Sequence, residues 1–366
     1  MTTLTARPSG SAVWLACPMG LTMQNRYGNR YPAGAAAEEG TAAHWVKEQL
    51  RLGNRPIVGD AAPNGVAIDD DMIYYGDQAN EYIDRFANGG QVFTERKLTI
   101  KLPGFEIRGT TDDLATVAID AERCMHIFDY KYGRVHVAAD SGQIKLYGIG
   151  ARQEFQIEKI KLHIIQPRDY SSKPTRSYDF TPAAQNEFCD EVIRALKLAH
   201  VSKPYALAGT HCRNCPGRGA HCSDNWDSAI SSMEELTRSI DSSPEAIGKM
   251  VRLMREAHDV VTAALKGVED EARYLLNGGG LVPGWSLQSS PGREKWTDEQ
   301  PVLDLAAGFG LLDTVSERRL ITPNQAIKAG LPAELVRMHT TRPQGEAKLV
   351  PTGETLAARI FGETQS

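Results

Sequence analysis

The sequence predicts an α/β protein with a central mixed sheet flanked by helices. Strand-like segments occur at residues 91–100, 105–110, 111–119 and 123–131, and another follows at 158–167. Helical patterns precede the first strand and separate the last two. Helices that precede and interrupt a run of strands are typical of a layered α/β architecture.

Local signals place the individual elements. The tight connection at 119–123 makes the strands on either side of it a hairpin. Ser141 can cap a helix that reaches about residue 153, and Thr181 followed by Pro182 opens another to about residue 200. One face of the strand 158–167 is apolar, through Ile160, Leu162 and Ile164. Other helices are expected within residues 9–24 and at about 41–52 and 69–88.

The texture of the sequence changes near residue 225, so we expect one domain over residues 1–225 and a mainly helical one over 226–366. A long amphipathic helix begins at Ser243 and Pro244 and ends at the glycines 278–280. Its apolar stripe is more typical of a core than of an interface, and it comprises Ile247, Met250, Met254, Val261, Leu265, Val268, Ala272 and Leu275. Short helices and turns are expected over residues 283–366, and no role is indicated for this part.

Composition describes an ordinary globular protein. The chain has 366 residues, of which 41% are hydrophobic and 24% charged. No apolar run is long enough to cross a bilayer, and the N-terminal residues do not resemble a secretory signal, so we expect a cytoplasmic protein with no membrane partner. The net charge of -5 does not decide for or against DNA binding, because an enzyme needs only a local positive groove.

The segment GTTDDLATVAIDAERCMHIFDYKYG carries two acids and a lysine that hairpin geometry brings together. Asp112 starts one strand and Asp129 ends its partner, so the two carboxylates can share a cation. Lys131 is two residues beyond Asp129, on the same face of a strand. Two carboxylates and an ammonium suit phosphodiester hydrolysis, in which the acids hold Mg²⁺ or Mn²⁺ and the lysine stabilises charge on the phosphoryl oxygens.

A bare D-x-K tripeptide is common, and three further features support the site. His44 lies in EEGTAAH at the start of a helix ahead of the sheet. Gln143 and Tyr147 are four residues apart and therefore share one face of the helix after the hairpin. Gly109 lies in an expected GTTD turn, where the backbone must be approached closely.

The ordered set GTAAH, GTTD, DYK and QIKLY resembles motifs I, II and III and the Q-x-x-x-Y signature of RecB-like nucleases. These include AddB-type recombination nucleases and CRISPR-adaptation nucleases. The resemblance extends to a phage- and prophage-encoded branch that reads SxxxWLxCP, GTAxH, GTxD, DYKYG and QLKLYALG, and it covers roughly residues 9–225. It implies a PD-(D/E)XK restriction-endonuclease-like core and a metal-dependent deoxyribonuclease.

The resemblance also implies roles for the residues at the matching positions. The metal ligands would be His44, Asp112, Asp129 and the carbonyl of Tyr130. Lys131 would be the catalytic lysine, and Gln143 and Tyr147 would act near the scissile phosphate or the DNA backbone. The G-x-x-D register selects Asp112, and the pleat points Asp113 the other way. Glu95 reads as a surface or salt-bridging residue, with an outer-shell acid as the alternative.

Three of the six cysteines are clustered as Cys212-x₂-Cys215-x₆-Cys222, which in a cytosolic chain is not a disulfide framework. In the resembling families, one cysteine upstream of motif I completes a [4Fe–4S] cluster, and Cys17 in WLACP occupies that position. The alternative is a structural Zn²⁺ site that uses His211 or His221. The other two cysteines, Cys124 and Cys189, read as small buried hydrophobic residues.

The resemblance implies an exonuclease that resects DNA ends in phage recombination or genome processing, within a bacterial host cell. Its partners would be DNA and a single-strand annealing or other recombination protein. Arg168, directly after the strand 158–167, is the best placed phosphate contact, and further cations flank the site: Arg96, Lys97, Lys101, Arg108, Arg134 and Lys145. The alternative is a non-catalytic DNA-end-binding accessory protein on the same fold. Cleavage polarity, strand preference and oligomeric state are not indicated.

Overall fold

The computed structural model describes residues 4–119, 122–235, 243–291, 295–315, 323–328, 330–341 and 344–351. The chain divides into two compact units, Met1–Val268 and Glu269–Ser366. The boundary expected near residue 225 falls inside the first unit. None of the helices formed by the described residues has the length and apolar character needed to span a bilayer.

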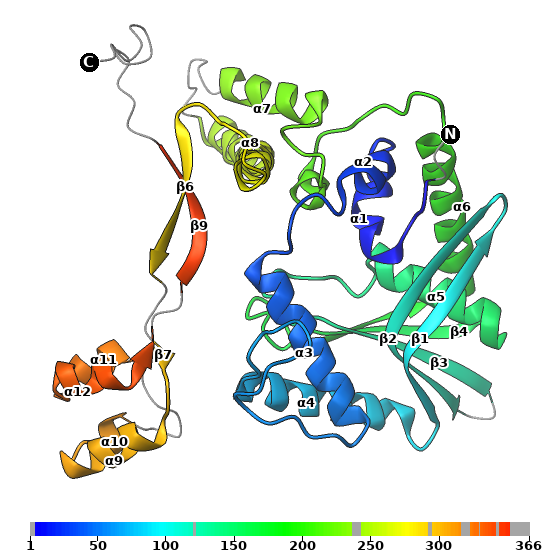
Figure 1. Ribbon diagram of the computed structural model, residues 1–366. Helices are drawn as coiled ribbons and strands as arrows, with labels where there is room; N and C mark the ends of the chain where they lie inside the picture. Colours follow the sequence, from blue (N-terminus) through cyan, green and yellow to red (C-terminus); the bar gives the residue numbers. More distant parts are fainter. Residues whose placement is uncertain are drawn as a thin grey trace, which may run out of the picture. The chain divides into compact units, whose positions relative to one another are not determined.

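The first unit contains the sheet and its covering helices (Figure 1). Its strands are β1 (Gln91–Leu102), β2 (Phe105–Ile119), β3 (Glu122–Tyr130), β4 (Lys159–Ile165) and β5 (Thr175–Phe180). Its helices before the sheet are η1 (Pro8–Gly10), α1 (Ser11–Trp14), α2 (Gly20–Tyr27), α3 (Ala35–Arg51) and α4 (Asp70–Ala87). The later helices are α5 (Gly142–Phe155), α6 (Pro182–Ala199), η2 (Thr210–Asn214), α7 (Ser223–Glu235) and most of α8 (Pro244–Asn277).

The five strands form one mixed sheet in the order β1-β2-β3-β4-β5. Strands β1, β2 and β3 pair antiparallel, and α5 then crosses over so that β4 runs parallel to β3. The expected α/β class with a central mixed sheet flanked by helices is confirmed. The two strands expected at 105–110 and 111–119 are one continuous strand, β2, and β5 was not predicted because its sequence TRSYDF is largely polar.

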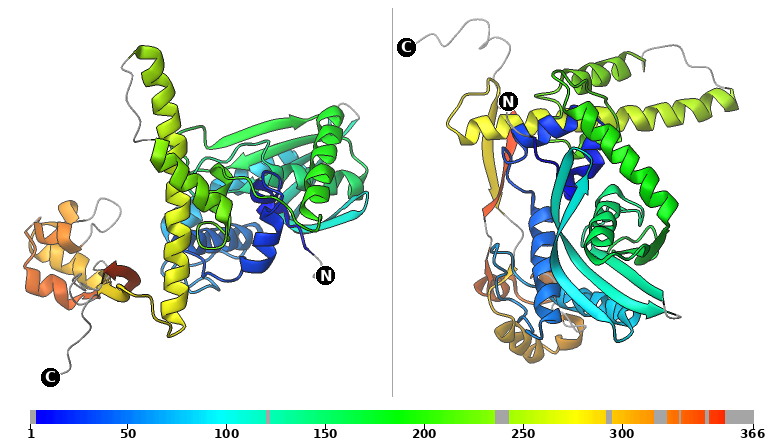
Figure 2. Two further views of the ribbon diagram at one scale, coloured as in Figure 1. Left: turned by 90° about the horizontal axis from the view of Figure 1, so that it is seen from above. Right: turned by 90° about the vertical axis from the view of Figure 1, so that its right-hand side faces the viewer.

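Each face of the sheet is covered by its own helices (Figures 1 and 2). On one face α5 and α6 bury an apolar cluster that includes Leu114 of β2 and Leu162 of β4. On the other face α3 and α4 pack over Ala115 of β2 and Phe128 of β3. Leu114 and Ala115 point to opposite faces because successive side chains alternate along a strand. The same alternation places the neighbouring acids Asp112 and Asp113 on opposite faces of the sheet.

The helix boundaries follow from identifiable caps. The Asp69 carboxylate accepts the Met72 N–H over 2.8 Å at the start of α4, and the Thr181 hydroxyl accepts the Ala184 N–H over 3.3 Å at the start of α6. Ser141 is the N-cap residue of α5 by position, although its side chain makes no capping hydrogen bond. Helix α3 begins at Ala35, earlier than expected, because the residues before Thr41 are mostly good helix formers.

Helix α8 is one helix of 34 residues, and the glycines after Asn277 end it as expected. Two glycines let it lie directly on the loop after η2. A Cβ on Gly219 would lie 2.2 Å from the Ala264 carbonyl oxygen, and one on Gly267 would lie 2.0 Å from the Arg218 carbonyl oxygen. This backbone-to-backbone contact joins α8 to the first unit.

The second unit contains strands as well as the expected short helices. Its strands form two separate two-stranded sheets, β6 (Trp285–Pro291) with β9 (Gln344–Pro351) and β7 (Lys295–Trp296) with β8 (Thr340–Thr341). Its helices are α9 (Gln300–Gly308), α10 (Leu312–Val315), α11 (Pro323–Lys328) and α12 (Ala333–Met338). The expected helical C-terminal region is consistent with these helices, whereas the strands were not predicted, because each has its partner far away in the sequence.

Candidate functional site

Asp112 and Asp129 meet where the pairing of β2 and β3 ends. Asp113 is opposite Phe128 in this antiparallel pair, so Asp112 and Asp129 are the next residues along the two strands. The Tyr130 N–H donates a hydrogen bond of 2.7 Å to Oδ2 of Asp112. The expected approach of the two acids is therefore found, and the backbone of β3 holds the first carboxylate in place.

Lys131 and Gln143 surround the carboxylate of Asp129. The Lys131 ammonium lies 3.1 Å from Oδ1 and 2.9 Å from Oδ2 of Asp129, and it donates to Oε1 of Gln143 over 3.2 Å. The Gln143 amide in turn donates to Oδ1 of Asp129 over 3.2 Å. Asp129 lies on β3, Lys131 directly follows the end of that strand, and Gln143 is the second residue of α5. The three side chains form a closed hydrogen-bonded triangle.

The carboxylate of Asp129 is buried, with 1% of the side chain exposed. Burial raises its pKa, and the Lys131 ammonium opposes this effect. Burial also acts on Lys131 and lowers its pKa, but the carboxylates of Asp129 and Asp112 outweigh it and raise the pKa. We therefore treat Lys131 as a protonated side chain. Oδ2 of Asp129 has the Lys131 ammonium as its ion-pair partner, so both oxygens of this buried carboxylate are contacted.

Tyr147 lies behind Gln143 on the same face of α5. Its ring is buried, which raises the pKa of the phenol, and the hydroxyl hydrogen-bonds the Gln143 side chain. Gly109 makes room for it, since a Cβ there would lie 3.0 Å from Cε1 of Tyr147 and 2.7 Å from Cγ of Pro8. The expected close approach at Gly109 is found, but the expected turn is not, because residues 109–112 lie within β2.

His44 reaches the site from α3, and its Nδ1 lies 3.5 Å from Oδ2 of Asp112. The ring packs edge-on against the buried ring of Tyr130, with centroids 5.3 Å apart. About a third of the His44 side chain remains exposed, so it lies at the rim of the site. The structure therefore brings His44, Asp112, Asp129 and Lys131 into one neighbourhood.

A second acid cluster, which sequence reasoning only touched on, lies behind Asp112. Lys47, one turn after His44 on α3, forms a buried ion pair with Asp113. The Thr94 hydroxyl donates to the same carboxylate over 2.8 Å. Its position three residues after His44 was the available signal for Lys47, because such residues share a helix face. Burial lowers the pKa of Lys47 to about 8.

Glu95 belongs to this cluster; the residue is exposed, although its carboxyl is partly desolvated. Its backbone is left-handed, with φ of 50°, between two residues of β1 that pair normally with β2. Burial raises the pKa of its carboxyl to about 7, and the nearby Asp112 and Glu48 add to this. Glu95 is exposed on β1, in agreement with the preferred interpretation of it as a surface residue.

Side chains at the ends of β4 and β5 hydrogen-bond the backbone of the loop that follows Lys131. The buried Gln166 amide donates to the carbonyl oxygens of Gly133 and Val135 over 2.8 and 2.7 Å. The Arg176 guanidinium donates to the Val137 carbonyl over 2.8 Å. Neither residue was predicted, and neither lies in a recognisable motif. They connect the ends of β4 and β5 to the loop beside the candidate site.

Arg168 is less available than expected. Its guanidinium pairs with Glu39 over 2.9 Å and lies 4.3 Å from the ring centroid of Tyr132, and 13% of its side chain is exposed. Among the other cations, Arg96 pairs with Glu154 and Arg108 with Glu106. The expectation of phosphate contacts by these residues remains a prediction.

The side chains at the site match an oxygen-preferring divalent cation in their chemistry. Two carboxylates and an imidazole are donors that Mg²⁺ or Mn²⁺ accept, and the Asp129 carboxylate is buried at this site. Among the described residues, no three His, Cys, Asp or Glu side chains are already grouped as they would be around a metal ion. His44, Asp112 and Asp129 are therefore neighbours and not a formed coordination sphere.

The four cysteines of the expected cluster lie together. Cys17, Cys212, Cys215 and Cys222 line one small cavity between α2 and the loop around η2, and all four are free of disulfides. The Leu207 N–H donates to the Cys17 sulfur, and the Gly209 N–H to the Cys212 sulfur, each over 3.4 Å. Residues almost two hundred positions apart in sequence thus share one sulfur-lined site.

The two histidines near the cysteines differ in position. His211 lies beside the sulfurs, and its hydrogen bonds to Cys17 and Cys212 raise its pKa to about 10. Burial raises the pKa of Cys17, but the hydrogen bond from His211 and the Leu207 N–H outweigh it, so the net shift is downward and favours the thiolate. His221 instead stacks on Tyr27, with ring centroids 4.0 Å apart.

Comparison with known proteins finds similar solved structures and a family model. No curated protein matches the chain. Among solved structures, the protein SSO0001 is similar with 15% identity and a TM-score of 0.32, over 59% of this chain and 85% of that one. A structure described as a "putative exonuclease" from Eubacterium rectale has 15% identity and a TM-score of 0.32, over 53% of this chain and 80% of that one.

A family model, in contrast, matches nearly the whole chain, from residue 4 to residue 355. The chain therefore belongs to the family described as protein of unknown function DUF2800.

Proposed function

We propose that this chain is a metal-dependent deoxyribonuclease that hydrolyses phosphodiester bonds. One observation carries the proposal: the triangle of the buried Asp129 with the half-buried Lys131 and Gln143, directly beside Asp112 and His44. A structural salt bridge would not require the two additional ligand-type side chains at its open edge.

Each side chain has a task in this proposal. Lys131 stabilises the negative charge that develops on the phosphoryl oxygens, and Gln143 holds its ammonium at Asp129. Tyr147 positions Gln143 from behind. A divalent cation would be held by His44, Asp112, Asp129 and the Tyr130 carbonyl, and when bound it polarises the phosphate and lowers the pKa of a water molecule.

The finer assignment is an exonuclease that resects DNA ends during phage recombination or genome processing. The support is the motif resemblance, and a single-strand annealing or other recombination protein is the partner that it implies. The sequence shows no helix-turn-helix, no zinc-finger helix and no aromatic RNA-binding signature, so we place the affinity for DNA in contacts with phosphates.

The cysteine cavity takes a structural role in the proposal. Cys17, Cys212, Cys215 and Cys222 would hold a [4Fe–4S] cluster that ties the N-terminal helices to the loop after α6. The N–H donors onto two of the sulfurs suit thiolate ligands of such a cluster. The alternative is one structural Zn²⁺ ion at the same thiolates.

Cleavage of end-labelled linear DNA and of closed circular DNA, with Mn²⁺ or Mg²⁺ present, tests the proposal. We expect the linear substrate to lose its label and the circle to persist, and Asp129→Asn to abolish this activity. The matched control is Lys161→Met, which removes only a surface ion pair with Asp179. Binding of DNA ends without cleavage by the wild-type protein would instead support the non-catalytic accessory protein.

A further inference from the structure

Helix α8 carries a repeat that the candidate site does not use. Mostly apolar residues recur along α8 at alternating intervals of four and three positions: Ile247, Val251, Met254, His258, Val261, Leu265, Val268, Ala272 and Leu275. All but His258 are apolar. This spacing averages 3.5 residues over four heptads, which is the core pattern of a coiled coil and not the 3.6-residue pattern of a helix on a globular core.

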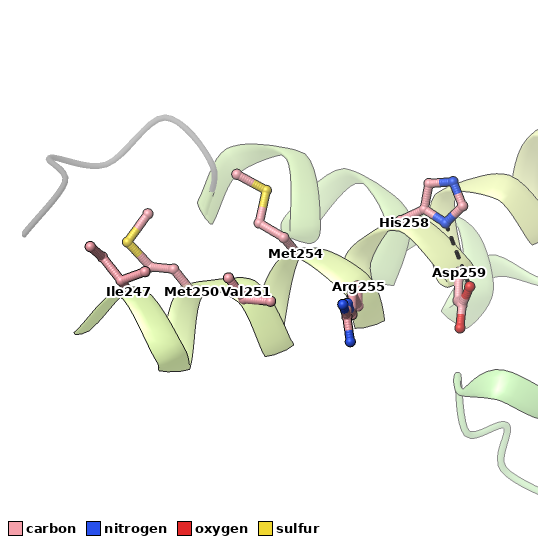
Figure 3. A pocket seen from close by; sticks show the side chains of 7 residues that line it. All are labelled: Ile247, Met250, Val251, Met254, Arg255, His258 and Asp259. Carbon is pink, nitrogen blue, oxygen red and sulfur yellow. Dashed lines mark ion pairs between the residues drawn. The ribbon is translucent and has the colours of Figure 1, made fainter. Parts of the chain in front are cut away.

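The fold leaves most of this stripe exposed, although Ala272 is buried and Val261 half-buried. Ile247, Val251 and Met254 are each 47% exposed and Leu265 is 58% exposed. Figure 3 shows the first of these side chains projecting from the N-terminal turns of α8, where they line an open, mainly apolar pocket. The expectation that the stripe is core was therefore wrong. An exposed apolar surface of this length is typical of an interaction site.

The chain's own packing uses a different side of the helix. Ala257 and Ala264 are buried, and Gly267 lies against the backbone of Arg218. These residues are offset from the stripe by one or more positions around the helix. The first unit thus docks α8 by its small residues and leaves the heptad stripe available to a partner.

The charges beside the stripe select the orientation of a second α8. Arg255 and Glu269 each directly follow a core position, Met254 and Val268, on the side of the helix away from Ala264. In an antiparallel pair these positions face each other, so each end of the dimer would join Arg255 of one copy to Glu269 of the other. In a parallel pair Arg255 would instead lie beside Met250.

The residues that would face each other across the two helices also favour the antiparallel arrangement. The same alignment places Val251 opposite Leu275, His258 opposite Val268 and Val261 opposite Leu265, so no two histidines meet. A parallel pair would place His258 against His258 of the second copy. Both the charge pattern and the layer composition therefore point to the same alignment.

We propose that this chain self-associates through α8, which forms an antiparallel two-helix coiled coil with the α8 of a second copy. The pair is centred near Thr262, and the stripe from Ile247 to Leu275 extends over about 42 Å at 1.5 Å per residue. The two-fold symmetry makes the surface self-complementary, as an isologous dimer requires. The proposal does not depend on the nuclease function.

The mass of the full chain in solution, measured by sedimentation equilibrium, tests self-association. We expect the mass of two chains for the wild type. Met254→Glu places a charge in two core layers of the dimer and should raise the dissociation constant by at least about a hundredfold. The matched control is Leu253→Glu, which adds the same charge at the adjacent, 41% exposed position off the stripe and should leave the dimer intact. A monomeric wild type, or equal effects of both variants, would overturn the proposal.

Cross-linking with a short bismaleimide tests the orientation. Thr262→Cys should give a covalent dimer, because the two copies of residue 262 face each other in the antiparallel pair, whereas His258→Cys should give none beyond that of the parent chain. The opposite result would mean a parallel pair and would overturn the antiparallel alignment. In addition, Arg255→Glu and Glu269→Arg should each weaken the dimer, and the double variant should restore it. Failure of that rescue would contradict the charge pairing.

Discussion

Asp112 and Asp113 are consecutive acids whose carboxylates have different partners. Asp112 accepts the Tyr130 N–H and lies beside His44, at the open edge of the candidate site. Asp113 is turned into the protein, where it pairs with Lys47 beneath α3. Pleat alternation separates them, so one acid is left for chemistry while its neighbour anchors the strand to the helix that carries His44.

The buried pair predicts a large effect on stability. Lys47→Met should lower the free energy of unfolding by about 3–5 kcal/mol, because it leaves the Asp113 carboxylate buried without its partner. The double variant Lys47→Met with Asp113→Leu should recover most of this loss. Urea unfolding provides the measurement. Arg55→Met is the control, because it breaks an exposed ion pair with Asp77 and should change stability by less than about 1 kcal/mol.

Lys131 is predicted to act on the rate of cleavage and not on DNA affinity. Lys131→Met should reduce the cleavage rate about 10²- to 10³-fold, since it removes a preorganised charge at the reacting phosphate. Gln143→Leu should give a smaller loss, because it only releases the ammonium from one of its partners. Single-turnover rates and DNA dissociation constants separate the two effects. Loss of binding with unchanged single-turnover rate would assign Lys131 to DNA contact.

Gly109 is predicted to tolerate no side chain. Gly109→Ala would place a methyl group 2.7 Å from Pro8 and 3.0 Å from the Tyr147 ring, so we expect a loss of about 1–3 kcal/mol of stability through overpacking. Gly40→Ala is the matched control, because nothing lies within 4 Å of that position and alanine favours the helix. Thermal unfolding compares the two variants, and equal melting temperatures would contradict the prediction.

The cysteine site predicts both colour and stability. If Cys17 holds a cluster, purified protein should be brown with broad absorbance near about 400 nm, and Cys17→Ser should lose this colour and unfold at lower temperature. Cys189→Ser, a half-buried cysteine away from the cavity, is the control and should keep the colour. The metal-ion dependence of any residual cleavage should not change. A colourless protein with one zinc ion per chain would favour the zinc alternative.

Two buried histidines predict acid sensitivity of the fold. His126 and His163 are hydrogen-bonded to each other over 2.9 Å, and burial lowers their pKa values to about 4 and about 3. Because the unfolded chain titrates near pH 6.5, it takes up protons first as the pH falls. Stability from this pair is therefore complete above about pH 6.5 and is lost between there and about pH 3.

The slope of this loss can be measured. Each histidine contributes up to about 1.4 kcal/mol per pH unit within that window. His163→Phe should reduce the slope of unfolding free energy against pH, and substitution of the exposed His200 should not. Chemical unfolding at a series of pH values provides the comparison. An unchanged slope in His163→Phe would show that the pair does not titrate on unfolding.

Local patterns in the sequence were sufficient for the sheet and for part of the site. Alternation and turn residues predicted β1 to β4 and the hairpin, because a half-buried strand must place apolar side chains at every second position. The hairpin then predicted that Asp112 and Asp129 lie close together on adjacent strands. The spacing of four residues predicted that Gln143 and Tyr147 share one face of a helix. The four cysteines line one cavity, and their binding of a cluster stays a prediction, because the described side chains are not grouped as they would be around a metal ion.

Only the tertiary structure decided which polar groups are buried and which apolar ones are not. Lys47 belongs to no sequence motif, and it is buried because it pairs with Asp113 of β2. The sequence gives no sign that Arg168 has an ion-pair partner. In the structure its guanidinium pairs with Glu39 of α3, which lies far away in the sequence. The apolar stripe of α8 reads as core, and it is exposed because two glycines dock the helix by its other side. Periodicity specifies the face of an element, but what covers that face depends on contacts between residues far apart in the chain.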